Sequence, residues 1–165
     1  MEPVVLFKER QAMWQNPIMW GVFPGIIVAF TIVFSKAKPD GSIDWTGVWV
    51  LMIAFGLLIF LTVGGNMRTE ITEDYIRVRW FPLQRKPRVI LWTEVKKAEL
   101  RNYSPLTEYG GWGLKGSRKN RAYNVTGDRG LQLELNDGTK VLIGTRKSET
   151  LEALLHELRR KSLIV

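Results

Sequence analysis

Two uncharged stretches decide the fold expected for this chain: residues 18–34, IMWGVFPGIIVAFTIVF, and residues 46–63, TGVWVLMIAFGLLIFLTV. As helices with 1.5 Å of rise per residue they would be about 26 and 27 Å long, close to the ~30 Å hydrocarbon core of a bilayer. Both are apolar on every side, which is typical of membrane spans rather than of surface helices. The sequence therefore predicts a two-helix transmembrane hairpin with spans 18–34 and 46–63.

The segments around these spans predict the topology. Residues 35–44 form a short polar connection with the turn sequence Pro39-Asp40-Gly41, so the spans are expected to be antiparallel neighbours. Basic residues in the outer flanks outnumber Lys36 and Lys38 in the connection, which places both termini in the cytoplasm by the positive-inside rule. We expect a multi-pass protein of the bacterial inner (plasma) membrane, with residues 1–17 as a cytoplasmic or interfacial segment. Four tryptophans are expected at the membrane interface, where indole rings favour the headgroup layer: Trp14, Trp20, Trp45 and Trp49.

The sequence after the second span is basic. From Gly65 onward there are 20 Lys and Arg against 12 Asp and Glu, an excess equal to the net charge of +8 of the whole chain. Such a surface attracts anionic lipid headgroups, nucleic acid or acidic protein surfaces. The chain has no cysteine, which excludes disulfides, thiolate metal sites and thiol catalysis.

Alternation of apolar and polar residues predicts that residues 66–165 form a β domain. In residues 75–80, Ile76, Val78 and Trp80 share one face and two arginines share the other. Asp137-Gly138 between two alternating runs is a strong hairpin signal. We expect about seven strands, near residues 67–72, 75–80, 88–92, 95–103, 121–126, 131–135 and 140–143. The leucines of residues 148–163 recur at helical spacing, which predicts a C-terminal amphipathic helix.

These features resemble the bacterial pleckstrin-homology-like (PH-like) domains that follow two-helix hairpins in small membrane proteins. The resemblance rests on loose patterns of strand and turn residues over most of the chain: Phe7-Lys8-Glu9-Arg10-Gln11, the pair 67–72 and 75–80, Ile90-Leu91-Trp92-Thr93-Glu94-Val95, and Tyr109-Gly110-Gly111-Trp112-Gly113. It implies an α+β membrane protein with a PH-like β-sandwich or barrel, and a membrane-proximal scaffold or binding role. It supplies no catalytic residues.

Two basic groups and one aromatic residue are the candidate binding residues. A charge next to an anionic leaflet is worth about 1 kcal/mol, so the groups suit contact with lipid or with a protein partner; the alternative is that they are solvated loops. Trp112 among three glycines suits an aromatic platform, and the alternative is that it fills the domain interior at a bulge. The candidates are Lys115, Arg118, Lys119, Arg121, Arg85, Lys86, Arg88 and Trp112.

Nothing in the sequence indicates catalysis. The single histidine, His156, lies on the predicted C-terminal helix without a partner constellation, and the carboxylates lack metal-binding spacing. We therefore expect no catalytic, cofactor-binding or metal-binding residues, no cofactor and no enzymatic activity.

Two functions fit this architecture. The first is a membrane-anchored binding or scaffold module whose basic domain engages a protein partner or the anionic inner leaflet. The alternative is an accessory subunit of a larger multi-subunit inner-membrane complex, stabilising it through transmembrane helices and a cytoplasmic cap. Expected partners are membrane lipid and a protein, a larger complex or a second copy of the chain. Nucleic acid and small-molecule substrates are not expected, since no recognition motif is present.

Overall fold

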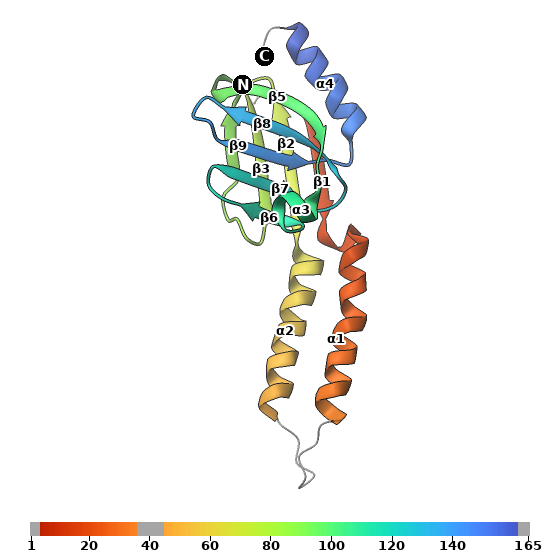
Figure 1. The fold of residues 1–165 in the computed structure, drawn as a ribbon. Coiled ribbons are helices and arrows are strands. Elements are labelled where there is room, and N and C mark those ends of the chain that lie inside the picture. The colour runs from red at the N-terminus through yellow and green to blue at the C-terminus, as the bar shows by residue number, and fades with distance from the viewer. Residues whose placement is uncertain (1–3, 36–44, 162–165) are drawn as a thin grey trace. The chain divides into compact units, whose positions relative to one another are not determined.

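The computed structural model of the chain describes residues 4–35 and 45–161 (Figure 1). They divide into two compact units: a β unit, made of the residues up to Gln11 and those from Asn66 onward, and a helical unit, Ala12–Gly65. The expected turn at Pro39–Gly41, both lysines of the connection and the predicted helical residues 162 and 163 lie outside the described residues.

The fold is a mixed α+β fold with two sheets. Its strands, among the described residues, are β1 (Val5–Ala12), β2 (Asn66–Thr72), β3 (Tyr75–Phe81), β4 (Arg88–Leu91), β5 (Val95–Asn102), β6 (Gly113–Gly116), β7 (Asn120–Asn124), β8 (Arg129–Leu135) and β9 (Lys140–Gly144). Its helices are α1 (Pro17–Ser35), α2 (Trp45–Gly64), α3 (Pro105–Tyr109) and α4 (Ser148–Arg160), with short 3-10 turns at Met13–Gln15 and Trp92–Glu94.

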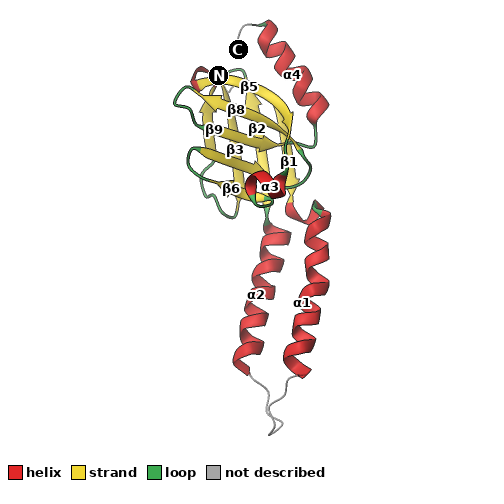
Figure 2. Ribbon diagram, in the orientation of Figure 1, coloured by secondary structure: helices red, strands yellow, loops and turns green. Residues whose placement is uncertain are grey.

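The β unit is a sandwich of two layers. One sheet has four strands in the order β1-β2-β3-β4, and the other has five in the order β5-β8-β9-β7-β6. In Figure 2 the strands of the five-stranded sheet run across those of the sheet behind it. The pairs β2–β3, β3–β4, β5–β8, β6–β7 and β8–β9 are antiparallel. Strands β7 and β9 pair in parallel, with Asn120 beside Lys140.

The core lies between the inner faces of the two sheets. Alternation buries every second residue of a strand, because successive side chains point to opposite faces. The largest fully buried side chains on the inner faces of the strands are Met67, Ile71, Ile76, Ile90, Tyr123, Leu131, Leu133 and Ile143. Trp80 also joins the layers, since its Nε1 donates to the carbonyl oxygen of Asn124 at 3.2 Å.

Much of the N-terminal segment forms strand β1 of this sandwich. Phe7, Glu9 and Gln11 of β1 point inward and are 4 %, 4 % and 1 % exposed. Glu9 Oε2 accepts from Thr145 Oγ1 at 2.6 Å and Glu9 Oε1 from the Arg146 amide at 2.9 Å. The β domain therefore begins before the helical unit and is interrupted by it, whereas the sequence predicted one continuous domain from residue 66.

Predicted and observed strands agree in place but not in number. All seven predicted segments contain a strand, and β1 and β6 are additional. The predicted C-terminal helix is confirmed as α4, whose leucine stripe is buried: Leu151, Leu154, Leu155 and Leu158.

The prediction of a two-helix transmembrane hairpin is wrong. Among the described helices, α2 alone is long and apolar enough to cross a membrane. In α1 the described apolar stretch is Pro17–Ile32, about 24 Å at 1.5 Å per residue, and Pro24 lies within it. That length is short of a ~30 Å hydrocarbon core. The multi-pass inner-membrane location is not supported. The prediction that both termini are cytoplasmic assumed two spans, so it is not supported either.

Within the helical unit the two helices contact each other through aromatic rings. Phe55 of α2 meets Phe23 edge-on, with ring centroids 6.0 Å apart, and also packs against Phe30. Most apolar side chains of α2 remain exposed: Trp45, Trp49, Val50, Met52, Ile53, Leu57, Ile59, Phe60 and Val63.

Candidate binding groove

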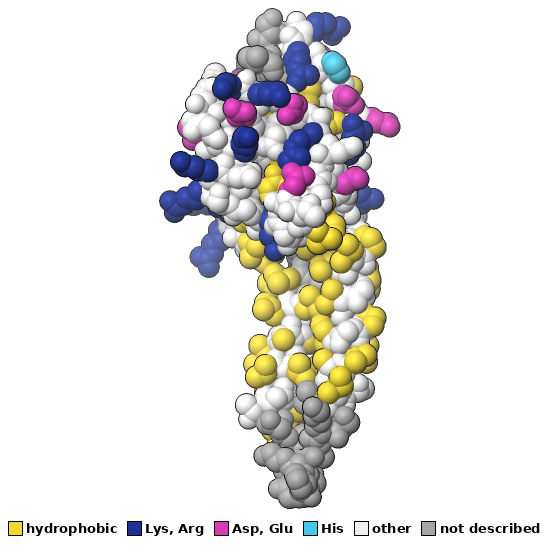
Figure 3. All heavy atoms as spheres, viewed as in Figure 1, with side chains coloured by type: hydrophobic (Ala, Val, Ile, Leu, Met, Phe, Trp, Pro, Cys, Tyr) yellow, Lys and Arg dark blue, Asp and Glu magenta, His cyan; other side chains and the backbone are white. Residues whose placement is uncertain are grey.

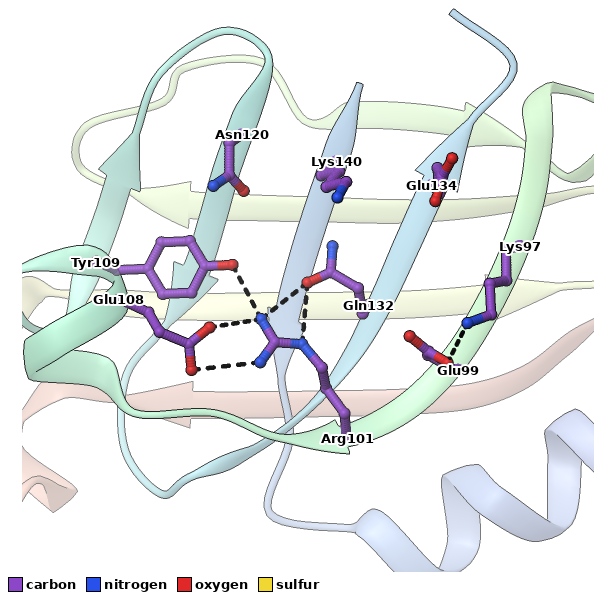
Figure 4. Close-up of a pocket in the computed structure, with 9 residues that line it drawn as sticks. All are labelled: Lys97, Glu99, Arg101, Glu108, Tyr109, Asn120, Gln132, Glu134 and Lys140. Carbon is purple, nitrogen blue, oxygen red and sulfur yellow. Dashed lines mark hydrogen bonds and ion pairs between the residues drawn. The ribbon is translucent and has the colours of Figure 1, made fainter. Parts of the chain in front are cut away.

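A charged groove of about 430 Å³ lies on the outer face of the five-stranded sheet (Figure 4). Strands β5, β8, β9 and β7 supply its floor and α3 forms one wall. The lining residues are Lys97, Glu99, Arg101, Glu108, Tyr109, Asn120, Gln132, Glu134 and Lys140. Strand pairing explains why they meet, since Glu99 is opposite Gln132, and Glu134 is opposite Lys140.

Arg101 is the most firmly held of these side chains. Its Nη2 and Nη1 donate to the two carboxylate oxygens of Glu108, at 2.8 and 3.3 Å. Its Nε and Nη2 both donate to Gln132 Oε1, at 3.2 and 3.1 Å, and Nη2 also reaches Tyr109 Oη at 3.4 Å. A bidentate arginine–carboxylate pair fixes the plane of the guanidinium, so this cation is pre-oriented in the groove (Figure 4).

This pairing changes the titration of the groups involved. The hydrogen bond from Arg101 lowers the pKa of the Glu108 carboxyl below its ordinary value, and the same bond raises the pKa of Arg101. Partial burial raises the pKa of the Tyr109 hydroxyl. At neutral pH the wall of the groove therefore presents a charged pair beside a neutral phenol.

Local sequence signals explain the position of α3. Ser104 caps the helix, with its Oγ accepting from the Thr107 amide at 3.5 Å, and Pro105 occupies the first helical position, where its missing N–H is not needed. Gly110 ends the helix in the left-handed conformation, φ 70°. Tyr109 then packs against a small apolar cluster on the same sheet face, formed by Tyr103, Ala122 and Leu142.

Charges of both signs alternate along the floor of the groove. Lys97 Nζ forms an ion pair with Glu99 Oε2 at 2.6 Å. Glu134 Oε1 forms an ion pair at 3.6 Å with the Nζ of Lys96, which does not line the groove. The lining holds three cationic and three acidic side chains, so it is close to neutral overall. The face of the molecule in Figure 3 shows the same mixture of Lys, Arg, Asp and Glu side chains.

The basic loop of residues 115–121 lies next to this groove, and none of its four basic side chains lines it. It is the β6–β7 hairpin, whose turn holds the exposed Arg118 and Lys119. Lys115 and Arg121 are half-buried on the two strands, and Arg121 donates its Nε to the Ser117 carbonyl at 3.1 Å. Asn120, the first residue of β7, does line the groove.

The second basic group lies elsewhere. Arg88 borders a separate hollow with Thr93, Asn136 and Asp137, while Arg85 and Lys86 are exposed in the turn before β4. The structure does not bring them into one described hollow with residues 115–121.

Trp112 is half-buried, between glycines with positive φ at positions 111 and 113. Its Nε1 is buried without a hydrogen-bond partner among the described residues. In the helical unit the four interface candidates have exposed rings, from 50 % for Trp14 to 62 % for Trp45. Their contact with headgroups stays a prediction.

The groove residues were missed because each looks ordinary in the sequence. Arg101 and Gln132 are outward-facing strand residues, a position where polar side chains need no special explanation. A usable signal was present nearby, since Ser104-Pro105 before Gly110-Gly111 marks the start and the end of a short helix. In residues 4–35 and 45–161 there is no group of three or more His, Cys, Asp or Glu side chains placed to hold a metal ion.

Comparison with known proteins assigns no family: no protein-family model and no curated protein sequence matches the chain.

Proposed function

We propose that the chain is a non-catalytic binding module that associates with a membrane through α2 and engages a protein partner through the charged groove. The observation that carries this proposal is the held guanidinium of Arg101 in a groove lined by both charge signs. A groove of balanced charge suits a protein segment with acidic and basic side chains, because complementary potentials give specificity. An anionic lipid surface would favour a uniformly basic site.

The exposed apolar surface of α2 supports membrane association. Its central side chains, among them Ile53 at 68 % and Leu57 at 56 % exposure, have no cover within the described residues. Monomeric soluble proteins rarely expose a contiguous patch of this kind.

Site-directed cross-linking tests the groove. The chain has no native cysteine, so Asn120→Cys gives one attachment point for a photo-crosslinker, and Val89→Cys on the other sheet is the matched control. In native membranes the groove position should give one discrete protein adduct that Lys140→Glu abolishes and Arg160→Glu, on α4, does not. Equal adducts from both positions, or an adduct indifferent to Lys140→Glu, would refute the groove as the partner site.

The second candidate is an accessory subunit of a larger membrane complex. The exposed α2 surface favours it, since neighbouring membrane helices could cover the same side chains. Purification from native membranes in mild detergent separates the candidates: a stoichiometric assembly that survives Lys140→Glu indicates the subunit function.

A further inference from the structure

The outer face of the four-stranded sheet, opposite the groove side of the sandwich, is strongly basic. Strands β1, β2 and β3 point five cationic side chains outward and one acidic side chain, Glu70. The cations are Lys8, Arg10, Arg68, Arg77 and Arg79. This face therefore differs from the balanced groove.

Glu70 neutralises only part of this charge. Its Oε1 is 3.2 Å from Lys8 Nζ and its Oε2 is 3.5 Å from Arg77 Nη1. Arg68 and Arg79 have no acidic partner within 4 Å among the described residues.

Strand register brings the remaining arginines into one row. Arg68 of β2 is directly opposite Arg79 of β3. Strands β1 and β2 run antiparallel, because the Met13 amide after β1 donates to the Gly65 carbonyl before β2 at 2.7 Å. With Lys8 beside Glu70, Arg10 then falls opposite Arg68. We call Arg10, Arg68 and Arg79 the arginine row.

Like charges placed directly opposite each other destabilise a sheet, so this row is suited to an anionic occupant. Two adjoining hollows of about 280 and 210 Å³ are both lined by Arg68 and Arg79. Arg79 is oriented by its Nε, which donates to the Gln84 carbonyl at 3.2 Å, so its two terminal nitrogens are left for a ligand. Arginine forks match phosphate oxygens in geometry and charge.

Chain order favours lipid phosphate as that occupant. Arg68 follows Gly64, the last residue of the apolar helix α2, by four positions. Exposed apolar side chains share the basic face, with Phe81 at 38 %, Val89 at 46 % and Leu91 at 45 % exposure. A surface that mixes unneutralised arginines with apolar side chains fits the headgroup layer of a membrane.

We propose that the arginine row is a docking site for the phosphate groups of anionic lipids. This inference rests on the membrane association proposed above, but it concerns a different sheet and a different ligand from the protein-binding groove.

Headgroup quenching in nanodiscs tests the docking site in the full chain. Val89→Cys carries a single fluorophore on the same sheet face, and the quencher is attached to lipid headgroups. Quenching should be stronger in discs of phosphatidylcholine with phosphatidylglycerol than in phosphatidylcholine alone. High salt should remove the difference, because exposed charges are screened.

Charge variants show whether the row is responsible. At about 1 kcal/mol per charge, Arg10→Gln, Arg68→Gln and Arg79→Gln together should lower the ratio of docked to undocked molecules on the order of 100-fold. The matched control Lys96→Gln, Arg118→Gln and Arg160→Gln removes the same charge from exposed positions outside both the arginine row and the groove, and it should retain the quenching. The corresponding Arg→Lys triple keeps the charge and should retain most of it.

Four outcomes would overturn the proposal. The first is equal quenching in neutral and anionic discs, and the second is an equal loss of quenching in the control triple. The third is loss of the quenching on addition of inorganic phosphate, where chloride of the same ionic strength has no effect. The fourth is a lower unfolding temperature of the Gln triple than of the unchanged chain in neutral discs. The third would identify free phosphate as the occupant. Flotation with phosphatidylcholine vesicles tests α2 separately: failure to float there refutes membrane association through α2, while a gain in flotation with phosphatidylglycerol still supports the arginine row.

Discussion

Replacing the buried carboxylate of Glu9 should destabilise the whole β unit. Glu9 is 4 % exposed and accepts two hydrogen bonds, from Thr145 Oγ1 at 2.6 Å and from the Arg146 amide at 2.9 Å. These bonds connect the first strand of the unit to the segment after its last strand. Few other polar contacts join positions so distant in the chain.

The magnitude follows from the two bonds. A hydrogen bond to a charged group contributes about 1.5–3 kcal/mol, and a buried donor left without its partner adds a desolvation cost. Glu9→Ala should therefore lower the free energy of unfolding by about 3 kcal/mol. For a unit of roughly 100 residues, about 5 °C per kcal/mol gives a fall of about 15 °C in Tm. Glu9→Gln keeps the shape and an acceptor oxygen, so it should cost about 1–1.5 kcal/mol.

The assay is thermal unfolding of the full chain in detergent, followed by near-ultraviolet circular dichroism. Lys8→Ala is the matched control, because Lys8 neighbours Glu9 on β1 but is 71 % exposed in its ion pair with Glu70. Exposed ion pairs contribute about 1 kcal/mol or less. The reasoning is refuted if Glu9→Ala lowers Tm no more than Lys8→Ala, since β1 would then not be tied to the rest of the unit.

Three further predictions test other parts of the β unit. Burial raises the pKa of Tyr103 to about 12, so folding favours the neutral phenol. The contribution of this group to the free energy of unfolding should be complete below pH 10 and decline between about pH 10 and 12. Tyrosinate absorbance and unfolding of the full chain over this pH range measure it. Arg101→Gln removes the hydrogen bond that lowers the pKa of Glu108, so an NMR titration should show that carboxyl returning toward its ordinary value; an unchanged midpoint would contradict the bidentate pair. Gly116→Ala places a Cβ at φ 83° against a backbone carbonyl across the hairpin turn, whereas the Cβ of Gly138→Ala meets nothing within 4 Å. Both variants carry a left-handed penalty of about 1–2 kcal/mol, so Gly116→Ala should lower the free energy of unfolding more than Gly138→Ala does. Equal Tm values would contradict the steric argument.

The strands found from the sequence are those whose inner faces are apolar. β3 and β8 alternate cleanly, with Ile76, Val78 and Trp80 inside one and Leu131, Leu133 and Leu135 inside the other. Period-two alternation is set by the geometry of a single strand, so a local pattern is enough to detect it. The same reasoning holds for α4, whose stripe depends on the helical repeat alone.

β1 could not be found in this way because two of its inward residues are polar. Glu9 and Gln11 interrupt the apolar period, and their partners Thr145, Arg146 and Gly144 are more than 130 positions away. Those polar groups find their hydrogen-bond partners only in the tertiary structure, so a local sequence pattern does not reveal that they are buried. β6 was missed for a different reason, since Gly113–Gly116 is four residues long and begins and ends with glycine, which reads as a loop.

The discontinuity of the β unit bears on both proposals. β1 and β2 are neighbours in one sheet, yet the whole helical unit lies between them in the chain. The chain therefore passes from the β unit into the helical unit and back through two strand connections rather than through one linker. The arginine row uses these two strands and β3, while the groove lies on the outer face of the opposite sheet. Because the two surfaces share no residue and face opposite sides of the sandwich, lipid contact at one leaves the other accessible to protein. A module that adapts a protein partner to a membrane surface requires that separation.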